Sequence, residues 1–463
     1  MTDKYKVSEV SSCVQDVDQI VAEISALSEK GEGIFKYKGD DVYVKNTVPQ
    51  DVVRVKLLAP FVKGSKRRLG KLVEMIKSSP RRAKPSEICT HQELCGGCPL
   101  GLLNVESQYE YKQQLITSAL EKAGIRGFKQ LAFTGSAHKD CRHKSIRFFK
   151  GSGDDVCQGF YQSRSHELCK VVSCPLEIAW FGDLAQDVCK TARETFVDAY
   201  DEETEKGCLR TLTMRDCGQG ERLAVLSYND PLPEEFVEKL GELFIKYQVR
   251  AGFIQCNQTR GNRIMTGVLK PLTKDEAIKT ELCGFDFEVG PYTFLQVNPV
   301  VAQNMYEAAL KWCGEDPKRE SLDLCCGCGT MTLMLAKKFK KVTGVEIVKE
   351  AVEAAFGNAV KAGIDNANFI AADLKIVLPE LSKKDLAAVI ADPPRAGLGS
   401  ANCRALKNLP KGVKLAVIFC GLKALSRDLK ELLDAGFILK AVQGFDMFPK
   451  AMGCETLCML EKQ

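Results

Sequence analysis

The feature that most restricts the fold is a regular alternation of strand and helix patterns over residues 291–463. Seven short apolar segments predict strands, and amphipathic segments between most of them predict helices. This alternation predicts an α/β fold with a doubly wound, Rossmann-like sheet, whose ligands bind at the carboxyl ends of the strands. The expected strands are 322–326, 342–347, 368–372, 387–392, 415–420, 438–445 and 456–460.

A local excess of positive charge marks the N-terminal part. The whole chain has a formal net charge of only +5, but residues 29–84 contain 15 Lys and Arg against 6 Asp and Glu. Short β patterns with Gly and Asp at the turns predict a small OB-like β-barrel there. A basic barrel of this kind favours a nucleic acid as partner. The alternative is a charge run that only solvates a loop, at Lys63, Lys66, Arg67, Arg68 and Lys71.

Three domains are expected. The barrel occupies residues 17–80, and a Pro- and Arg-rich segment links it to the rest. Residues 85–290 form a mixed α/β central domain, because strand and helix patterns alternate between 209 and 257. Residues 291–463 form the doubly wound domain, and a helix at about 100–125 is expected to pack on it.

The chain shows no targeting or membrane signal. No apolar run approaches the roughly 18 residues that a membrane helix needs, and the first residues lack the apolar stretch of a signal peptide. A cytoplasmic protein without an obligate protein partner is therefore expected. An odd count of 21 cysteines is a poor disulfide framework in that compartment, so each cysteine is a ligand, a nucleophile or core filler.

A glycine turn after the first C-terminal strand predicts a nucleoside site. Gly327 and Gly329 allow a tight turn, and Glu346 ends the next strand, where it suits a ribose diol. Thr332 stands where a dinucleotide fingerprint has its third glycine, which favours a nucleoside without pyrophosphate, such as S-adenosylmethionine. Asp373 and Asp392 follow the third and fourth strands and face the same crevice.

Cys420 is the candidate nucleophile. It lies between an apolar strand and a helix pattern, where the helix N-terminus is expected to lower the thiol pKa. The alternative is a buried thiol that only fills space. Asp392-Pro393-Pro394 is followed by Arg395, where adenine N6-methylating enzymes carry an aromatic residue. RNA cytosine-C5-methylating enzymes have a cysteine in this segment, and here there is none, so a C5 methylation would need a thiol from elsewhere.

Cys89, Cys95 and Cys98 are spaced to bind one metal centre, with Gly96 and Gly97 allowing a tight loop. Four thiolates suit zinc or an iron–sulfur cluster equally well. The fourth ligand is remote in sequence, and the candidates are Cys141, Cys157, Cys169 and Cys174. We expect core or incidental roles for Cys208, Cys217, Cys256, Cys283, Cys313, Cys403 and Cys458.

Taken in order, these motifs resemble the RNA uracil-C5 methyltransferase family, especially its bacterial 23S rRNA members. The resemblance extends over nearly the whole chain. The matching segments are the barrel, which resembles a TRAM domain, Cys89 to Cys98, Gly159-Phe160-Tyr161 with Cys174, Phe294 to Asn298, Cys326-Gly327, Asp392 to Arg395, Cys420 with Arg427-Asp428, and Asp446 to Pro449 with Glu455.

The resemblance implies a role for each matching residue. It makes Cys420 the nucleophile that attacks uracil C6 and Glu455 the base that removes the C5 proton. It makes Cys174 the fourth ligand of a [4Fe-4S] cluster. It assigns S-adenosylmethionine binding to Gln296, Cys325, Thr330, Glu346, Asp373 and Asp392.

The sequence departs from the family pattern at two places. Gly421-Leu422 replaces an Asn-Pro pair after the nucleophile, and the histidine usual near Gly453 and Cys454 is missing. The expected function is methylation of uridine C5 in 23S rRNA. The alternatives are the same chemistry on tRNA, a noncatalytic RNA-binding iron–sulfur protein, and a cytosine-C5 methyltransferase, which the missing cysteine disfavours.

Overall fold

The computed structural model describes residues 19–58, 67–163, 165–259 and 265–463. Contacts divide the chain into two compact units, one of residues 1–88 and 99–107 and one of residues 89–98 and 108–463. Lys63 and Lys66, named above as possible loop residues, lie outside the described part. Among the described residues, no helix combines the length and apolar character that crossing a membrane requires.

The first unit is a six-stranded sheet in the order β1-β5-β6-β4-β3-β2. The two edge strands, β1 and β2, are neighbours in the chain and were not predicted. Arg67, Arg68 and Lys71 belong to β6, so the alternative of a solvated loop is wrong for them. Arg68 Nε lies 2.7 Å from Asp40 Oδ2. The elements are β1 (Gln19–Glu23), β2 (Ala26–Leu27), β3 (Gly33–Tyr37), β4 (Asp40–Val44), β5 (Val52–Leu57), β6 (Arg67–Lys77) and the 3-10 helix η1 (Pro85–Glu87).

Alternating side chains build the core of this sheet. In β5, Val53, Val55 and Leu57 are buried while the residues between them are partly exposed. This two-residue period is that of a strand with one face on a core. Val42, Val44 and Phe35 complete the same apolar cluster, which contains no helix.

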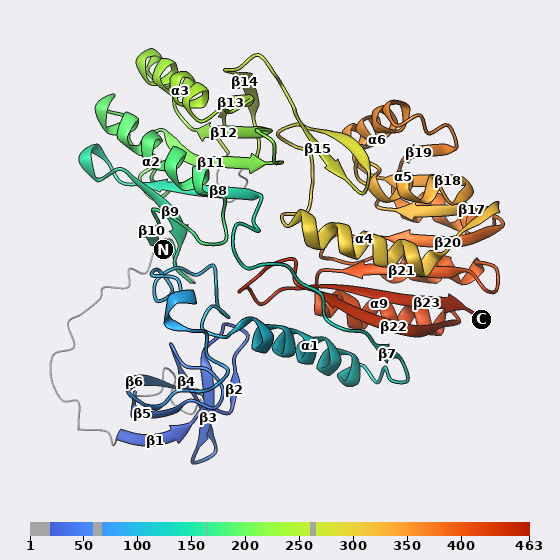
Figure 1. The fold of residues 1–463 in the computed structure, drawn as a ribbon, viewed down its shortest axis with the longest axis horizontal. Coiled ribbons are helices and arrows are strands. Elements are labelled where there is room, and N and C mark those ends of the chain that lie inside the picture. The colour runs from blue at the N-terminus through green and yellow to red at the C-terminus, as the bar shows by residue number, and fades with distance from the viewer. Residues whose placement is uncertain (1–18, 59–66, 164, 260–264) are drawn as a thin grey trace, which may run out of the picture. The chain divides into compact units, whose positions relative to one another are not determined.

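A mixed seven-stranded sheet, in the order β10-β9-β8-β11-β12-β13-β14, forms the central part of the second unit. Helices α2 and α3 cover one face of it (Figure 1). The elements are β8 (Lys144–Lys150), η2 (Gly153–Asp155), β9 (Cys157–Tyr161), β10 (Leu168–Lys170), α2 (Ala179–Glu194), β11 (Leu209–Asp216), β12 (Arg222–Tyr228), α3 (Glu234–Lys246), β13 (Ala251–Cys256) and β14 (Val268–Pro271).

The other face of this sheet is covered in part by a hairpin. Strands β15 (Ile278–Leu282) and β16 (Phe285–Val289) pair in antiparallel fashion. Ile278 and Val289 pack with Leu223 and Val225 of β12. The hairpin therefore covers β12 and β13, whereas β8, β9 and β11 contribute nothing to this cluster.

An eight-stranded sheet in the order β19-β18-β17-β20-β21-β23-β22-β7 forms the C-terminal part. Each of the seven predicted strands coincides with an observed one, and β23 is antiparallel to both of its neighbours. The strands are β17 (Asp316–Leu324), β18 (Phe339–Glu346), β19 (Ala367–Ala371), β20 (Leu386–Ala391), β21 (Lys414–Phe419), β22 (Phe437–Phe445), β23 (Glu455–Lys462) and the unpredicted β7 (Lys129–Gln130).

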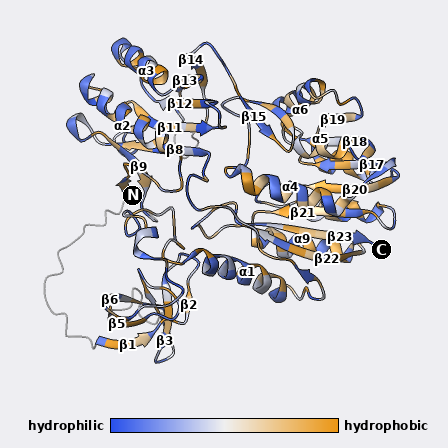
Figure 2. Ribbon diagram, in the orientation of Figure 1, coloured by the Kyte–Doolittle hydropathy of each residue, from blue (hydrophilic) through white to orange (hydrophobic). Residues whose placement is uncertain are grey.

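Helices cover both faces of this sheet. Its central strands β20 and β21 are buried along almost their whole length, and Figure 2 colours them as largely hydrophobic. Burial on both faces is usual for strands in a doubly wound sheet. The remaining elements are α4 (Pro299–Cys313), α5 (Thr330–Ala336), α6 (Lys349–Lys361), α7 (Leu374–Leu381), α8 (Ser400–Ala405), η3 (Leu406–Asn408) and α9 (Leu422–Asp434).

Helix α1 (Val105–Lys122) lies beside this sheet although it is distant in sequence. Ile116 and Leu120 are fully buried in the same core cluster as β21 and β22. The Lys112 ammonium group, also fully buried, pairs with Asp446 and donates to the Phe448 carbonyl over 2.9 Å. The pair ties the helix to the loop between β22 and β23.

Candidate functional site

The glycine turn that follows β17 has a left-handed backbone at three positions. Cys325, Gly327 and Gly329 have φ values of 63°, 53° and 91°. A side chain on Gly329 would come within 3.1 Å of Ala355, whereas nothing lies within 4 Å of the corresponding position on Gly327. The turn therefore closes tightly under Gly329 and leaves open space beside Gly327, where a ligand can approach the backbone.

Glu346, at the end of β18, is positioned by the turn itself. Its Oε2 accepts from the Gly327 amide over 3.2 Å, and its Oε1 accepts from the Ile347 and Val348 amides. A carboxylate has about four acceptor positions, so one remains for a ligand hydroxyl. The structure thus places Glu346 beside the turn, as the sequence predicted.

Asp323 is a buried carboxyl group beneath this turn that was not among the predicted site residues. Burial raises its pKa to about 7, and the charge of Glu346 adds to the effect, although the Thr332 hydroxyl donates to its Oδ2 over 2.6 Å. Its Oδ1 has no hydrogen-bond partner among the described residues. An orphaned acceptor of this kind fits a ligand that donates a hydrogen bond.

The other predicted cofactor residues surround the same strand ends. Thr330 begins α5 and is buried, and burial together with the nearby carboxylates raises the pKa of the Cys325 thiol to about 12. Asp373 caps α7 and accepts from the Lys375 amide over 2.9 Å. Helix capping is by itself a sufficient structural reason for an aspartate at this position, whether or not Asp373 also contacts a cofactor.

Asp392 and Gln296 meet at the end of β20. The Gln296 amide donates to Asp392 Oδ2 over 3.5 Å. Burial and the charge of Asp323 raise the Asp392 pKa to about 7. Burial and the charge of Asp392 also raise the pKa of Tyr306 far above its usual range, whereas a hydrogen bond with Gln296 lowers it. Tyr306 was not predicted, because a tyrosine inside a helix pattern resembles core.

Cys420 and Glu455 come from adjacent antiparallel strands. Phe419, the last residue of β21, pairs with Thr456, so the next position in the register sets Cys420 opposite Glu455. Glu455 is almost fully buried, and burial together with the Asp392 charge raises its pKa to about 8. Its Oε2 has no partner within the described part of the chain.

The expected low pKa of Cys420 is wrong. Burial raises the pKa of the thiol above its usual value, and the charges of Glu455 and Asp392 raise it further. The positive charge of Arg395 lowers the pKa of the thiol. Two carboxylates near the thiol, together with its burial, therefore outweigh the helix N-terminus on which the prediction relied.

Arg395 is held at this site by a braced loop. Asp428 on α9 is fully buried, and its Oδ2 accepts from the amides of Leu398 and Gly399 over 2.7 and 3.3 Å. Arg427 donates to the Ala396 carbonyl over 2.6 Å. The Arg427-Asp428 pair thus fixes the loop that carries Arg395 near Cys420.

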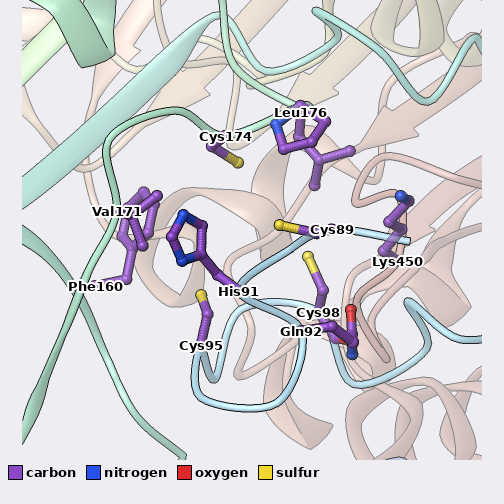
Figure 3. A pocket seen from close by; sticks show the side chains of 11 residues that line it. Cys89, His91, Gln92, Cys95, Cys98, Phe160, Val171, Cys174, Leu176 and Lys450 are labelled. Atoms are coloured by element: carbon purple, nitrogen blue, oxygen red, sulfur yellow. The ribbon is translucent and has the colours of Figure 1, made fainter. Parts of the chain in front are cut away.

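A second site lies in the central part of the same unit. Cys89, Cys95, Cys98 and Cys174 line one pocket, whose free space is about 400 Å³ when its open mouth is included. Figure 3 shows their sulfur atoms turned toward this space. A side chain on Gly96 would come within 2.7 Å of the Ser163 backbone, which explains the glycine.

Two further side chains of this pocket were not predicted. His91 and Lys450 line it with the cysteines (Figure 3). Burial and the three neighbouring thiols raise the Cys98 pKa to about 12, while Lys450 lowers it. Lys450 comes from the loop between β22 and β23, so only tertiary structure brings it here.

The pocket gathers thiols but does not close around a metal. Within residues 19–58, 67–163, 165–259 and 265–463, no three Cys, His, Asp or Glu side chains are arranged closely enough to hold a metal ion. The donor set still has the chemistry of a zinc or iron–sulfur site. Cys141, Cys157 and Cys169 do not line the pocket. Of the seven cysteines expected to be structural, Cys313, Cys403 and Cys458 are buried in apolar clusters.

Comparisons with known proteins agree on one family. The family model described as tRNA (uracil-5-)-methyltransferase matches residues 217–463. An uncharacterised RNA methyltransferase of Caldanaerobacter subterraneus subsp. tengcongensis is 30% identical over 448 residues, covering 95% of this chain and 97% of that protein. One of Clostridium acetobutylicum is 29% identical over 449 residues, covering 95% and 96%.

A solved structure shares the fold. The Pyrococcus abyssi tRNA (uracil-54, C5)-methyltransferase in complex with S-adenosyl-L-homocysteine superposes with a TM-score of 0.75 at 23% identity. The match covers 95% of this chain and 99% of that one. The architecture described above is therefore that of a known enzyme fold over almost the whole chain.

Proposed function

The chain belongs to the RNA uracil-C5 methyltransferase family, and on that premise we propose that it methylates uridine C5 in 23S rRNA through a covalent bond between Cys420 and uracil C6. The activity as an S-adenosylmethionine-dependent RNA uracil methyltransferase follows from the family. The observation that carries the mechanism is the position of Cys420 opposite Glu455, beside Asp392 and Arg395.

The proposed chemistry begins with the thiolate of Cys420. Uracil C5 is a weak nucleophile, and addition of the thiolate to C6 produces an enolate with electron density on C5. The bound cofactor supplies an electrophilic methyl group. Glu455 then takes the proton from C5, and elimination of Cys420 restores the ring. Glu455 suits this step because its raised pKa of about 8 makes it a stronger base than an ordinary carboxylate.

The proposed cofactor contacts are those around the glycine turn and the neighbouring strand ends. Glu346 and the open space beside Gly327 suit a ribose, and the orphaned Oδ1 of Asp323 supports a ligand nearby. Gln296 and Asp392 lie between this region and Cys420. The complete proposed set is Gln296, Cys325, Thr330, Glu346, Asp373 and Asp392.

We also propose that Cys89, Cys95, Cys98 and Cys174 bind a [4Fe-4S] cluster, with zinc as the less favoured metal. Their common pocket and their donor chemistry support this. Methylation involves no redox step, so a role in folding or in shaping the RNA site is expected. Cluster assembly would tie Cys174 to the segment that carries Cys89, Cys95 and Cys98, from which it is distant in sequence.

The N-terminal six-stranded sheet is proposed to be a TRAM-like barrel that binds RNA. The chain-adjacent strands β1 and β2 stand at the two ends of the strand order, which suits closure of the sheet. The basic side chains of β5 and β6 supply positive charge for phosphates. Removing residues 1–84 is expected to weaken RNA binding and to leave cofactor binding intact.

The decisive experiment is methyl transfer from labelled S-adenosylmethionine to unmodified 23S rRNA and tRNA in parallel, followed by nucleoside mass spectrometry. 5-Methyluridine in 23S rRNA would support the proposal. Label only in tRNA would keep the mechanism and change the substrate. This second candidate is favoured by the tRNA (uracil-5-)-methyltransferase family model and by the likeness to the Pyrococcus abyssi tRNA methyltransferase.

A trapping assay separates an enzyme from a noncatalytic RNA-binding protein. RNA containing 5-fluorouridine lacks the C5 proton that Glu455 would remove, so the adduct cannot be resolved. A gel-stable adduct is expected with the native chain and not with Cys420→Ala. An adduct that still forms with Cys420→Ala would overturn the assignment of the nucleophile.

A further inference from the structure

Arg215 on β11 is a deeply buried cation for which the described residues offer no carboxylate. Its side chain is only 4% exposed, and its Nη2 donates to the Thr293 carbonyl over 2.9 Å. Two other buried cations behave differently, since Arg147 pairs with Glu177 and Lys112 pairs with Asp446. A buried charge without a counter-charge is costly, which suggests that a ligand supplies one.

A second cation stands directly beside it. Lys144 on β8 pairs with Arg215 in the antiparallel register, and its ammonium group makes no hydrogen bond or ion pair within the described residues. Side chains at paired positions lie about 5 Å apart, and like charges there destabilise a sheet. Burial and the charges of Arg215 and Arg142 lower the Lys144 pKa to about 8.

Both side chains belong to the sheet face opposite helices α2 and α3. The neighbouring residue Asp216 points to the opposite face, where it accepts from Trp180 of α2 over 2.7 Å. Leu223, the partner of Arg215 on β12, packs with the β15–β16 hairpin instead. The cation pair therefore lies on the same face as this hairpin, on strands β8 and β11, which contribute nothing to the hairpin's apolar cluster.

The pair also lies next to the proposed methyl-transfer site. Thr293 and Val297 belong to the loop that carries Gln296, and the His143 amide donates to the Val297 carbonyl over 2.8 Å. The charge of Cys328, in the glycine turn, raises the pKa of Arg215, so the two side chains are near each other. An anion bound by Lys144 and Arg215 would thus lie close to the glycine turn and to the loop that carries Gln296.

We propose that Lys144 and Arg215 form a binding site for a backbone phosphate of the RNA substrate, close to the target uridine. This proposal rests on the function proposed above and adds to it a specific contact with the nucleic acid. The phosphate supplies the negative charge that no described carboxylate provides, and a guanidinium group can bind it with two parallel hydrogen bonds.

The surroundings favour RNA over the carboxylate of the cofactor. Arg142, exposed and adjacent to Lys144, continues the positive charge toward solvent, where a polymer can follow it and a small cofactor cannot. The rings of Phe148 and Tyr161, with centroids 4.5 Å apart, lie along the same sheet face. Cations next to aromatic rings are typical of surfaces that bind single-stranded nucleic acid.

The test is the Lys144→Met variant of the full-length protein, with separate measurements of two affinities. A short single-stranded oligouridylate reports RNA binding, and S-adenosylhomocysteine reports cofactor binding. We expect RNA affinity to fall by about three- to tenfold, with the slope of log affinity against log salt reduced by about one. The cofactor affinity should stay unchanged, and the unfolding temperature should rise because a like-charge pair is removed.

Lys150→Met is the matched control. Lys150 lies on the same strand and the same face, but its charge is already paired with Glu167 over 3.0 Å, so RNA affinity should change little. Arg215→Lys keeps the charge and serves as a second variant that retains the phosphate contact, although more weakly. It should lose less affinity than Arg215→Met.

Two results would overturn the phosphate site. One is an unchanged RNA affinity in Lys144→Met; the other is a loss of S-adenosylhomocysteine affinity without loss of RNA affinity, which would assign the pair to the cofactor carboxylate. The oligouridylate assay measures binding alone. Its result can therefore be interpreted even if the protein methylates neither 23S rRNA nor tRNA. The two proposals can therefore fail separately.

Discussion

Cys420 and Glu455 face each other across the ends of β21 and β23, and the charge of Glu455 makes ionisation of the Cys420 thiol more costly. The negative charge of Glu455 raises the pKa of the Cys420 thiol, and that of Asp392 raises the pKa of Glu455 to about 8. The site therefore stores its two reactive groups in their protonated forms at neutral pH. A cation or a bound substrate is needed to favour the thiolate, and the positive charge of Arg395 lowers the pKa of both groups.

Replacing Cys420 by Ala is expected to lower methyl transfer by at least about a thousandfold, because no other group can activate C5. RNA and S-adenosylhomocysteine affinities should change little. Cys403→Ser is a suitable control, since Cys403 is buried between α8 and α9, and its loss should affect stability rather than chemistry. Methyl transfer by the Cys420→Ala variant at the native rate is the result that contradicts the mechanism.

Glu455→Gln should allow the covalent bond to form but not to resolve, because the C5 proton then has no base. We expect a gel-stable complex with ordinary uridine RNA, which the native chain releases. The complex should depend on both RNA and S-adenosylmethionine. Rapid turnover without accumulation would assign the base to another group.

The rate of methyl transfer should rise with pH through about 8. Glu455 must be ionised to act as a base, and its pKa is raised to about 8, while the raised pKa of Cys420 acts in the same direction. The expected kcat/KM profile therefore has its rising limb near pH 8 in the free enzyme. A profile that is already flat at pH 6 would show that neither raised pKa limits the reaction.

The same shift predicts a stability change. The pKa of Glu455 is higher in the folded chain than in the unfolded chain, so the native protein loses stability as pH rises from about 4.5 to about 8. Glu455→Gln carries no such penalty and should be more stable above pH 8, by up to a few kcal/mol. Below pH 4 the two unfolding temperatures should converge, which thermal scans across pH will measure.

Asp428→Asn is expected to loosen the loop that carries Arg395. Asp428 is fully buried and accepts two loop amides, and hydrogen bonds to a charged group contribute roughly 1.5 to 3 kcal/mol. We expect kcat to fall by about tenfold or more, with unchanged S-adenosylhomocysteine affinity. Asp434→Asn, at the exposed end of the same helix, is the control.

Cys98→Ser should abolish the proposed metal centre, because it removes one of four donors from a shared pocket. The purified variant is expected to lack the visible absorption and the iron content of the native chain. Cys157→Ser changes a thiol outside the pocket, whose Sγ instead contacts the Lys150 carbonyl, and should retain both. Equal metal content in the two variants would refute the ligand assignment.

The local pattern of the sequence determined most of the C-terminal fold. Apolar segments of strand length and amphipathic segments of helix length are decided by neighbouring residues, so all seven strands could be predicted. The errors at their ends are at most three residues, except that β17 begins six residues before the predicted start. The positions of Glu346 and Asp392 could be predicted for the same reason, since each lies at the end of a predicted strand. Strands β2 and β7 were missed because each has only two residues, which is too short for a periodic pattern. Strand β1 was missed although its burial alternates.

The tertiary structure decided what these residues do to one another. β23 pairs with β21 in antiparallel fashion, a non-local contact that sets Glu455 opposite Cys420, and the resulting burial reverses the pKa shift expected for the thiol. The pairing of Lys144 with Arg215 depends in the same way on two strands far apart in sequence. Chemical identity and local periodicity are properties of the sequence, whereas desolvation and charge proximity arise only when distant segments pack together.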